Sequence, residues 1–180
     1  MEQKLQYIVD KIGELNIQIN EKQAEQFFRY YELLVEWNGF MNLTGITDFE
    51  DVVCKHFVDS LSIISTKDMS TVENLIDIGT GAGFPGLPLK IAFPNVKVTL
   101  LDSLNKRIQF LDHVIEETGL TDIETIHGRA EDFAKPGLKR EIYDLCVSRA
   151  VANLATLSEY CLPYVKIGGE FIPYKSGEVA

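Results

Sequence analysis

Apolar side chains recur at helical spacing near the start of the chain. Leu5, Ile8, Ile12 and Leu15 lie three or four positions apart. This period places them on one face of a helix, with polar residues on the other faces. The pattern therefore predicts an amphipathic helix over residues 3–15.

Two capping pairs predict further helices. Asn20 is followed three residues later by Gln23, and Thr47 is followed in the same way by Glu50. A short polar side chain with Glu or Gln at the third helical position is typical of a helix N-terminus. We expect the first pair to open a long helix with aromatic residues along one face, and the second to open a helix through Phe57.

The pattern changes near residue 75, where short apolar runs begin to alternate with amphipathic stretches. Such alternation is typical of a parallel sheet covered by helices on both faces. We therefore expect an N-terminal helical cap over residues 1–70 and an α/β domain over residues 71–180. The helices expected in the second part cover residues 105–118 and 151–164. The expected strands are residues 75–78, 96–101, 123–126, 142–147 and 170–174.

A glycine-rich turn follows the first expected strand. Gly79, Gly81, Gly83 and Gly86 fall within eight residues, and Pro85 stands where the next helix would begin. Glycine allows positive φ and close approach of a ligand to the backbone. A strand, a glycine turn and a helix N-terminus in this order predict a site for a nucleotide-like ligand.

Two cofactor classes compete for this turn. Gly81-x-Gly83-x-x-Gly86 satisfies the dinucleotide pattern, whereas Asp77-x-Gly79-x-Gly81-x-Gly83 satisfies the pattern of S-adenosylmethionine (SAM) methyltransferases. The Asp77 carboxylate suits the ammonium and sulfonium of SAM and would repel a pyrophosphate. We therefore favour SAM, and a nicotinamide-dependent oxidoreductase is the alternative.

Ligands of open α/β sheets bind beyond the carboxyl ends of the strands. Asp102 ends the second strand, about 20 residues after the glycines, where an acid accepts hydrogen bonds from ribose hydroxyls. Glu131, after the third strand, could contact an adenine edge. Arg149 ends the fourth strand, a costly place for an unpaired cation. The alternatives are that Asp102 caps the next helix and that Arg149 forms an ion pair with a nearby carboxylate.

Composition limits the cellular setting and the partners. Net charge is −10 and the pI is about 4.8, which argues against a free-standing nucleic-acid binder. Several cations nevertheless fall near strand ends, so a local basic rim and scattered surface charge both remain open. The chain shows no apolar run of membrane-spanning length, no signal peptide and no metal pattern. The odd number of cysteines, widely spaced, indicates reduced thiols. We expect a cytoplasmic, metal-free monomer.

Several catalytic patterns are missing from the sequence. No N-P-P-Y-type run follows the fourth strand, and no Ser-His-Asp spacing appears. Cys146 lies inside a strand and Cys161 inside a helix, so neither is placed as a nucleophile. The chemistry must then need little beyond positioning. Methyl transfer to a lone pair that carries no proton fits this requirement.

Taken together, these segments resemble the ribosomal small-subunit methyltransferase G family, also called glucose-inhibited division protein B. The matching pieces span most of the chain in order. They are Trp37-Asn38, Asn42-Leu43-Thr44, Lys55-His56-Phe57-Val58-Asp59-Ser60-Leu61, Asp77-Ile78-Gly79-Thr80-Gly81-Ala82-Gly83-Phe84-Pro85-Gly86, Arg129-Ala130-Glu131 and Ser148-Arg149-Ala150-Val151-Ala152.

The resemblance implies a Rossmann-like, SAM-dependent enzyme that methylates N7 of a guanine in 16S ribosomal RNA, free or in a small-subunit particle. It implies no general base and no covalent nucleophile. Arg149 would serve as a positioning residue toward the cofactor or the guanine O6. The cofactor contacts that it implies are Gly79, Phe84, Ala130, Glu131 and Arg149.

The chain departs from the family at its C-terminal end. The family's sheet normally finishes with two more strands after the one that ends near Tyr174, whereas this chain stops at Ala180. We therefore expect those strands to be missing and the fifth strand to form a sheet edge. A non-catalytic module that binds SAM or ribosomes is the second alternative.

Overall fold

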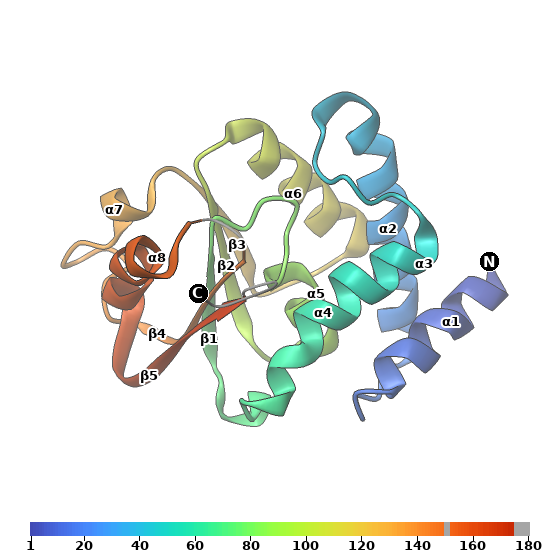
Figure 1. Ribbon diagram of the computed structural model, residues 1–180, viewed down its shortest axis with the longest axis horizontal. Helices are drawn as coiled ribbons and strands as arrows, with labels where there is room; N and C mark the ends of the chain where they lie inside the picture. The colour runs from blue at the N-terminus through green and yellow to red at the C-terminus, as the bar shows by residue number, and fades with distance from the viewer. Residues whose placement is uncertain (150–151, 175–180) are drawn as a thin grey trace.

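A computed structural model describes residues 1–149 and 152–174 of the chain (Figure 1). Five strands form one sheet in the order β3-β2-β1-β4-β5, and every neighbouring pair is parallel. This is the parallel sheet that the alternating pattern predicts. The strands are β1 Asn74–Ile78, β2 Lys97–Asp102, β3 Ile123–His127, β4 Tyr143–Arg149 and β5 Val165–Tyr174.

The strand order reverses beside β1. The chain runs outward from β1 through β2 to β3, and then returns to place β4 on the other side of β1. Asp77 near the end of β1 is in register with Leu100 of β2 and with Val147 of β4. The carboxyl ends of β1 and β4 therefore meet at the switch point, where open α/β sheets bind their ligands.

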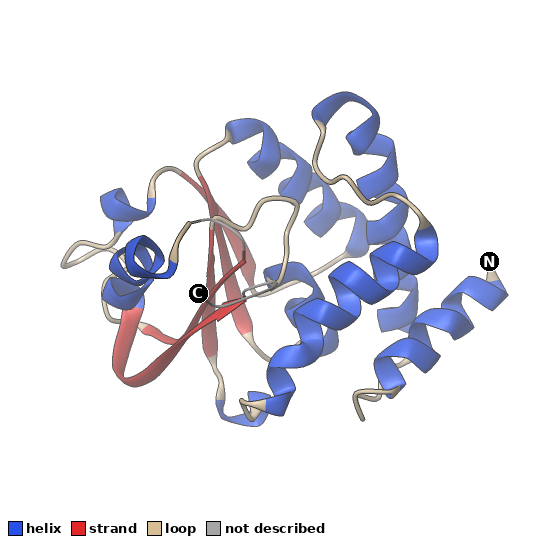
Figure 2. Cartoon of the chain, in the orientation of Figure 1, coloured by secondary structure: helices blue, strands red, loops and turns tan. Residues whose placement is uncertain are grey.

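Helices cover both faces of the sheet (Figure 2). Alternate strand residues point to opposite faces, so Leu75 and Leu145 join the core beneath one helical layer, whereas Ile76 and Cys146 join the core beneath the other. The first layer contains α5 and α6, and the second contains α7 and α8. Their bounds are α5 Gly86–Ala92, α6 Asn105–Thr118, α7 Ala130–Phe133 and α8 Leu154–Cys161.

The N-terminal helices pack outside α5 and α6 (Figure 1). Tyr30 of this group contacts the rings of Phe57, Phe84 and Phe110, so the helical part and the α/β part share one hydrophobic core. The division into residues 1–70 and 71–180 stays a prediction. The N-terminal elements are α1 Glu2–Gly13, α2 Glu21–Met41, α3 Phe49–Val52, a π-helical segment Val53–Val58 and α4 Asp59–Leu61, followed by 3₁₀ turns at Ser62–Ser65 and Met69–Thr71.

The two predicted capping pairs have different outcomes. The capping box of Asn20 and Gln23 is confirmed, with both reciprocal hydrogen bonds at 2.9 Å. The prediction for Thr47 is wrong by one residue, because Asp48 caps α3 and accepts from the Asp51 amide at 3.1 Å. Both residues are good N-caps, so the spacing to an acidic residue did not separate them.

The last strand begins earlier than the sequence predicts. The strand expected from residue 170 starts at Val165, so Gly168 and Gly169 lie inside β5, next to an irregular register between Tyr143 and Leu145 of β4. A Cβ on Gly169 would lie 2.8 Å from the Asp144 carbonyl oxygen. The glycine is therefore needed for close approach of the two strands.

Two other predictions concern the chain on either side of β5. The helix predicted over residues 151–164 is shorter: Asn153 caps α8, and a 3₁₀ turn follows at Leu162–Tyr164. Val151, where that prediction begins, lies outside the described residues. The expected loss of the family's final strands concerns the chain beyond Tyr174, which also lies outside them. Within the described sheet, β5 is an edge strand.

Candidate functional site

The glycine turn after β1 divides into two parts with different roles. Gly81 has a φ of +62°, and a Cβ there would meet nothing within 4 Å, so its face is open. A Cβ on Gly83 would lie 2.4 Å from Leu87 Cδ1, and one on Gly86 would lie 2.4 Å from Leu100 Cδ2. The earlier glycine leaves room for a ligand, whereas the later two let α5 pack against the sheet.

Asp77 lies beneath this turn and is fully buried. Its Oδ2 accepts from the Thr80 hydroxyl at 2.7 Å and from the Gly86 amide at 2.8 Å. Its Oδ1 is buried and has no hydrogen-bond partner among the described residues. Burial raises the pKa of the carboxyl to about 7, although those two donors and Arg149 act in the opposite direction. An uncompensated carboxylate oxygen at this point favours a cationic ligand nearby.

Asp102 ends β2 and is 2 % exposed. Its Oδ2 accepts from the Gly81 amide at 2.9 Å, and its Oδ1 accepts from the Leu104 amide at 2.9 Å. The carboxylate therefore fixes the glycine turn and the start of α6 together. Arg107 Nη1 also donates to Oδ2, at 3.4 Å, so the second lone pair of Oδ1 is the acceptor that remains for a hydroxyl group.

A cavity of about 400 Å³ opens between these elements. Its residues come from the segment after α2, the π-helical segment, the glycine turn, the end of β2, the first turn of α6 and the end of β4. Five of the predicted cofactor residues line it, namely Gly79, Gly81, Phe84, Asp102 and Arg149. Its lining is Leu43, Thr44, His56, Gly79, Thr80, Gly81, Ala82, Phe84, Asp102, Ser103, Arg107 and Arg149.

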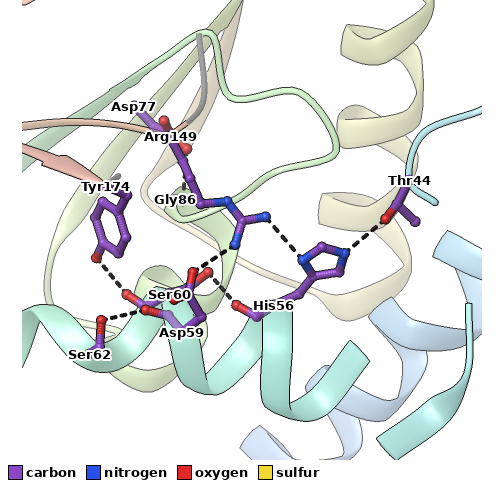
Figure 3. A network of polar contacts seen from close by, with 9 residues as sticks. All are labelled: Thr44, His56, Asp59, Ser60, Ser62, Asp77, Gly86, Arg149 and Tyr174. Atoms are coloured by element: carbon purple, nitrogen blue, oxygen red, sulfur yellow. Dashed lines mark hydrogen bonds and ion pairs between the residues drawn. The ribbon is translucent and has the colours of Figure 1, made fainter. Parts of the chain in front are cut away.

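Arg149 contacts three side chains, and Figure 3 shows two of them, Asp59 and His56. Its Nη1 lies 3.1 Å from Asp59 Oδ2, its Nη2 lies 3.1 Å from His56 Nδ1, and its Cζ lies 4.9 Å from the centroid of the Phe84 ring. The ion pair that the sequence leaves open is therefore formed, with Asp59 as the partner. The guanidinium carries five N–H donors, so these contacts leave others for a ligand.

His56 stands between Arg149 and Thr44 and packs flat on Phe84, with 4.5 Å between ring centroids. Burial and the charge of Arg149 lower the pKa of its imidazole to about 4. The ring is therefore neutral at physiological pH and is engaged through both nitrogens.

Ala130 and Glu131 start α7, beyond the end of β3, and are not among the residues that line the cavity. The loop before them is tied to β2, because the Gly128 amide donates to the Asp102 carbonyl oxygen at 3.0 Å. Glu131 is exposed and Ala130 is buried. Their contact with the base of an adenosine stays a prediction.

The sequence does not assign roles to three residues of this site, Thr44, His56 and Asp59, although they belong to segments that resemble the family. Nothing in their local pattern indicates that His56 and Asp59 contact Arg149, about 90 residues further along the chain, or that Thr44 contacts His56. Only the tertiary structure brings them together.

These residues fit an adenosine-sulfonium ligand. Asp102 offers acceptors for a ribose, the buried oxygen of Asp77 favours positive charge, and Arg149 offers donors for a carboxylate. Among the described residues, no helix is long and apolar enough to cross a membrane. The same residues contain no group of three His, Cys, Asp or Glu placed to hold a metal ion.

Comparison with known proteins identifies the family of the chain. The family described as rRNA small subunit methyltransferase G matches residues 23–180. The chain is 56% identical over 171 residues to the Ribosomal RNA small subunit methyltransferase G of Lachnoclostridium phytofermentans, covering 95% of this chain and 71% of that protein. It is 52% identical over 175 residues to the protein of the same name from Staphylococcus carnosus, covering 97% of this chain and 73% of that protein.

Solved structures with low sequence identity show the same fold. A putative caffeoyl-CoA O-methyltransferase from Staphylococcus aureus has a TM-score of 0.55 at 21% identity, covering 79% of this chain and 65% of that one. A putative S-adenosyl-L-methionine-dependent methyltransferase from Methanococcus maripaludis also has a TM-score of 0.55, at 19% identity, covering 79% and 61%. The predicted Rossmann-like methyltransferase fold is therefore confirmed. The chain belongs to the rRNA small subunit methyltransferase G family, whose members are SAM-dependent rRNA methyltransferases.

Proposed function

We propose that this chain transfers the methyl group of SAM to N7 of a guanine in small-subunit (16S) ribosomal RNA. One observation carries the choice of acceptor: the described residues that line the cavity offer no free general base. Both nitrogens of His56 are engaged. The carboxylate of Asp102 holds two backbone amides and the Arg107 guanidinium, and its remaining acceptor capacity is assigned to the ribose. Guanine N7 carries no proton, so its methylation requires none to be removed.

When bound, SAM supplies a methyl group activated by its sulfonium. The chain's own residues bind and orient the reactants. Asp102 accepts hydrogen bonds from a ribose, and the glycine turn provides open backbone beside it. The pKa of Asp77 is about 7, so a cationic ligand beside its unpartnered Oδ1 would favour the ionised carboxylate beneath the turn. Catalysis of this kind rests on proximity and orientation rather than on proton transfer.

Arg149 would act as a positioning residue. A guanidinium stays protonated at any working pH, so it cannot serve as a base. Its unused N–H groups can hold the carboxylate of the cofactor or donate to the guanine O6. A donor on N7 itself would block the nucleophile, so contact with the cofactor or with O6 is favoured.

The substrate we propose is 16S ribosomal RNA or a small-subunit particle, met by a monomer in the cytoplasm. The net charge of −10 argues against tight binding to RNA of unrelated sequence. Lys106 and Arg129 are exposed near the carboxyl ends of β2 and β3, and they support a local basic rim beside the cavity. A nicotinamide cofactor is not favoured, because the relatives are methyltransferases.

Replacement of Arg149 tests the proposed site. In Arg149→Ala the rate of methyl transfer to small ribosomal subunits should fall about tenfold or more. That is the effect expected from the loss of one hydrogen bond to a charged group. Arg149→Lys should recover little, because the planar fork is lost. Arg140→Ala, which removes an exposed arginine paired with Glu141, is the matched control.

Circular dichroism would establish that each Arg149 variant is folded. Near-normal turnover of folded Arg149→Ala, with an unchanged KM for SAM, would make Arg149 an ordinary structural cation and remove the main support for this site.

A further inference from the structure

The contact between Arg149 and His56 fixes the protonation of the imidazole. A guanidinium nitrogen can only donate, so His56 Nδ1 must accept across the 3.1 Å to Arg149 Nη2. The low pKa of His56 keeps the ring neutral. A neutral imidazole whose Nδ1 is bare carries its proton on Nε2. The ring therefore presents one acceptor to Arg149 and one donor to the opposite side.

That donor points at Thr44 (Figure 3). His56 Nε2 lies 2.9 Å from Thr44 Oγ1, and the Ile46 amide donates to the same oxygen at 3.1 Å. A hydroxyl oxygen has two lone pairs and one proton. Both lone pairs of Thr44 are thus occupied, so the hydroxyl can take part in a further bond only as a donor.

The Thr44 proton has no acceptor within the described part of the chain, whose contacts to Oγ1 are the two above. Thr44 is half-buried and lines the same cavity as the glycine turn, Asp102 and Arg149. A hydroxyl that can only donate, beside a cation with unused donors, selects an anionic oxygen and disfavours an ammonium.

We propose that the Thr44 hydroxyl binds the carboxylate of the amino-acid portion of SAM, and that His56 is the positioning residue that keeps this hydroxyl a donor. Asp102, at the end of β2, accepts from the adenosine portion, so the two residues hold opposite ends of one ligand. Arg149 contributes to the same carboxylate and orients His56. This assignment rests on the cofactor of the family and is independent of the methyl acceptor.

Two probes that differ only in the amino-acid portion test the proposal. S-adenosylhomocysteine carries it, whereas 5′-methylthioadenosine has the same adenosine thioether without it. By calorimetry, Thr44→Val should bind S-adenosylhomocysteine on the order of tenfold more weakly, the usual loss for a hydrogen bond to a charged group. Its affinity for 5′-methylthioadenosine should stay within about twofold of the wild type.

Matched variants separate the hydroxyl from its surroundings. Thr44→Ser keeps the hydroxyl and should retain wild-type affinity for both probes. Thr47→Val, at an exposed threonine of the same segment, should change neither affinity. An equal loss for both probes in Thr44→Val, or no loss for either, would overturn the proposal, and so would lost methyl transfer with unchanged affinity for S-adenosylhomocysteine.

The role of His56 has a spectroscopic signature. In ¹⁵N NMR of the wild-type protein, His56 should show a protonated Nε2 and a bare Nδ1 that do not titrate above about pH 5, as expected for a pKa of about 4.

His56→Phe keeps the ring stack on Phe84 and should lose affinity for S-adenosylhomocysteine selectively, as Thr44→Val does. The double variant should lose no more affinity than either single variant. The opposite tautomer, or additive losses, would contradict the positioning role. Failure to methylate RNA would count against the proposed function and leave these binding results unaffected.

Discussion

Replacing Asp77 with asparagine should change how the stability of the protein depends on pH. The carboxyl is fully buried, and burial raises its pKa from 3.8 to about 7. Because the folded pKa lies above the unfolded value, the stabilising contribution is complete below pH 3.8 and is lost as the pH rises through about 7. Asparagine keeps an oxygen for the Thr80 and Gly86 donors and carries no charge.

The size of the effect follows from the pKa. At about 1.4 kcal/mol for each pH unit of difference, ionised Asp77 costs the folded state about 4 kcal/mol. The asparagine variant leaves a buried N–H group in place of the unpartnered Oδ1, which costs about 1–3 kcal/mol at every pH. The difference in unfolding free energy between variant and wild type should therefore shift in favour of the variant by about 4 kcal/mol between pH 4 and pH 8.

Urea unfolding at several pH values measures this difference directly. His56 acts in the opposite sense, because its pKa is lowered from 6.5 to about 4, so its contribution is lost as the pH falls through that range. His56 is present in both proteins, and its effect cancels to first order in the comparison. Parallel stability curves for wild type and Asp77→Asn would refute the raised pKa and with it the electrostatic role assigned to Asp77.

Two further outcomes are expected. Asp102→Asn should weaken SAM binding by about 1–3 kcal/mol, as measured by calorimetry, whereas Asp122→Asn, at an exposed acid, should not; equal affinity in the two variants would reject the ribose contact. Binding to naked, unrelated RNA should be weak because the chain carries a net charge of −10, and it should fall with salt because a basic rim binds phosphates by releasing counterions; tight, salt-insensitive binding in a filter assay would contradict recognition through that rim.

The sequence predicts the parts of this molecule that depend on local pattern. The strands, the glycine turn and Asp102 at the end of β2 follow from short apolar runs and from the position of one acid relative to the glycines. The separate roles of Gly81 and Gly86 cannot be predicted from the local sequence. The clash that Gly86 of α5 avoids is with Leu100, which lies in β2.

The side chains around Arg149 could not be predicted from the sequence either, because they come from segments far apart in the chain. Arg149 meets Asp59 and His56 only because α4 and the preceding π-helical segment are placed beside the end of β4. The proton arrangement on His56 is then set by what Arg149 can donate, which is a property of the contact and not of either segment alone.

The identity of the methylated nucleoside tests the central claim most directly. Small ribosomal subunits from cells that lack this enzyme would be incubated with the chain and with SAM carrying a labelled methyl group, and the RNA would be digested and its nucleosides separated by mass spectrometry. We expect the label in 7-methylguanosine, at about one per 16S RNA for one specific guanine. Label in a different nucleoside, or spread over many guanines, would contradict the account.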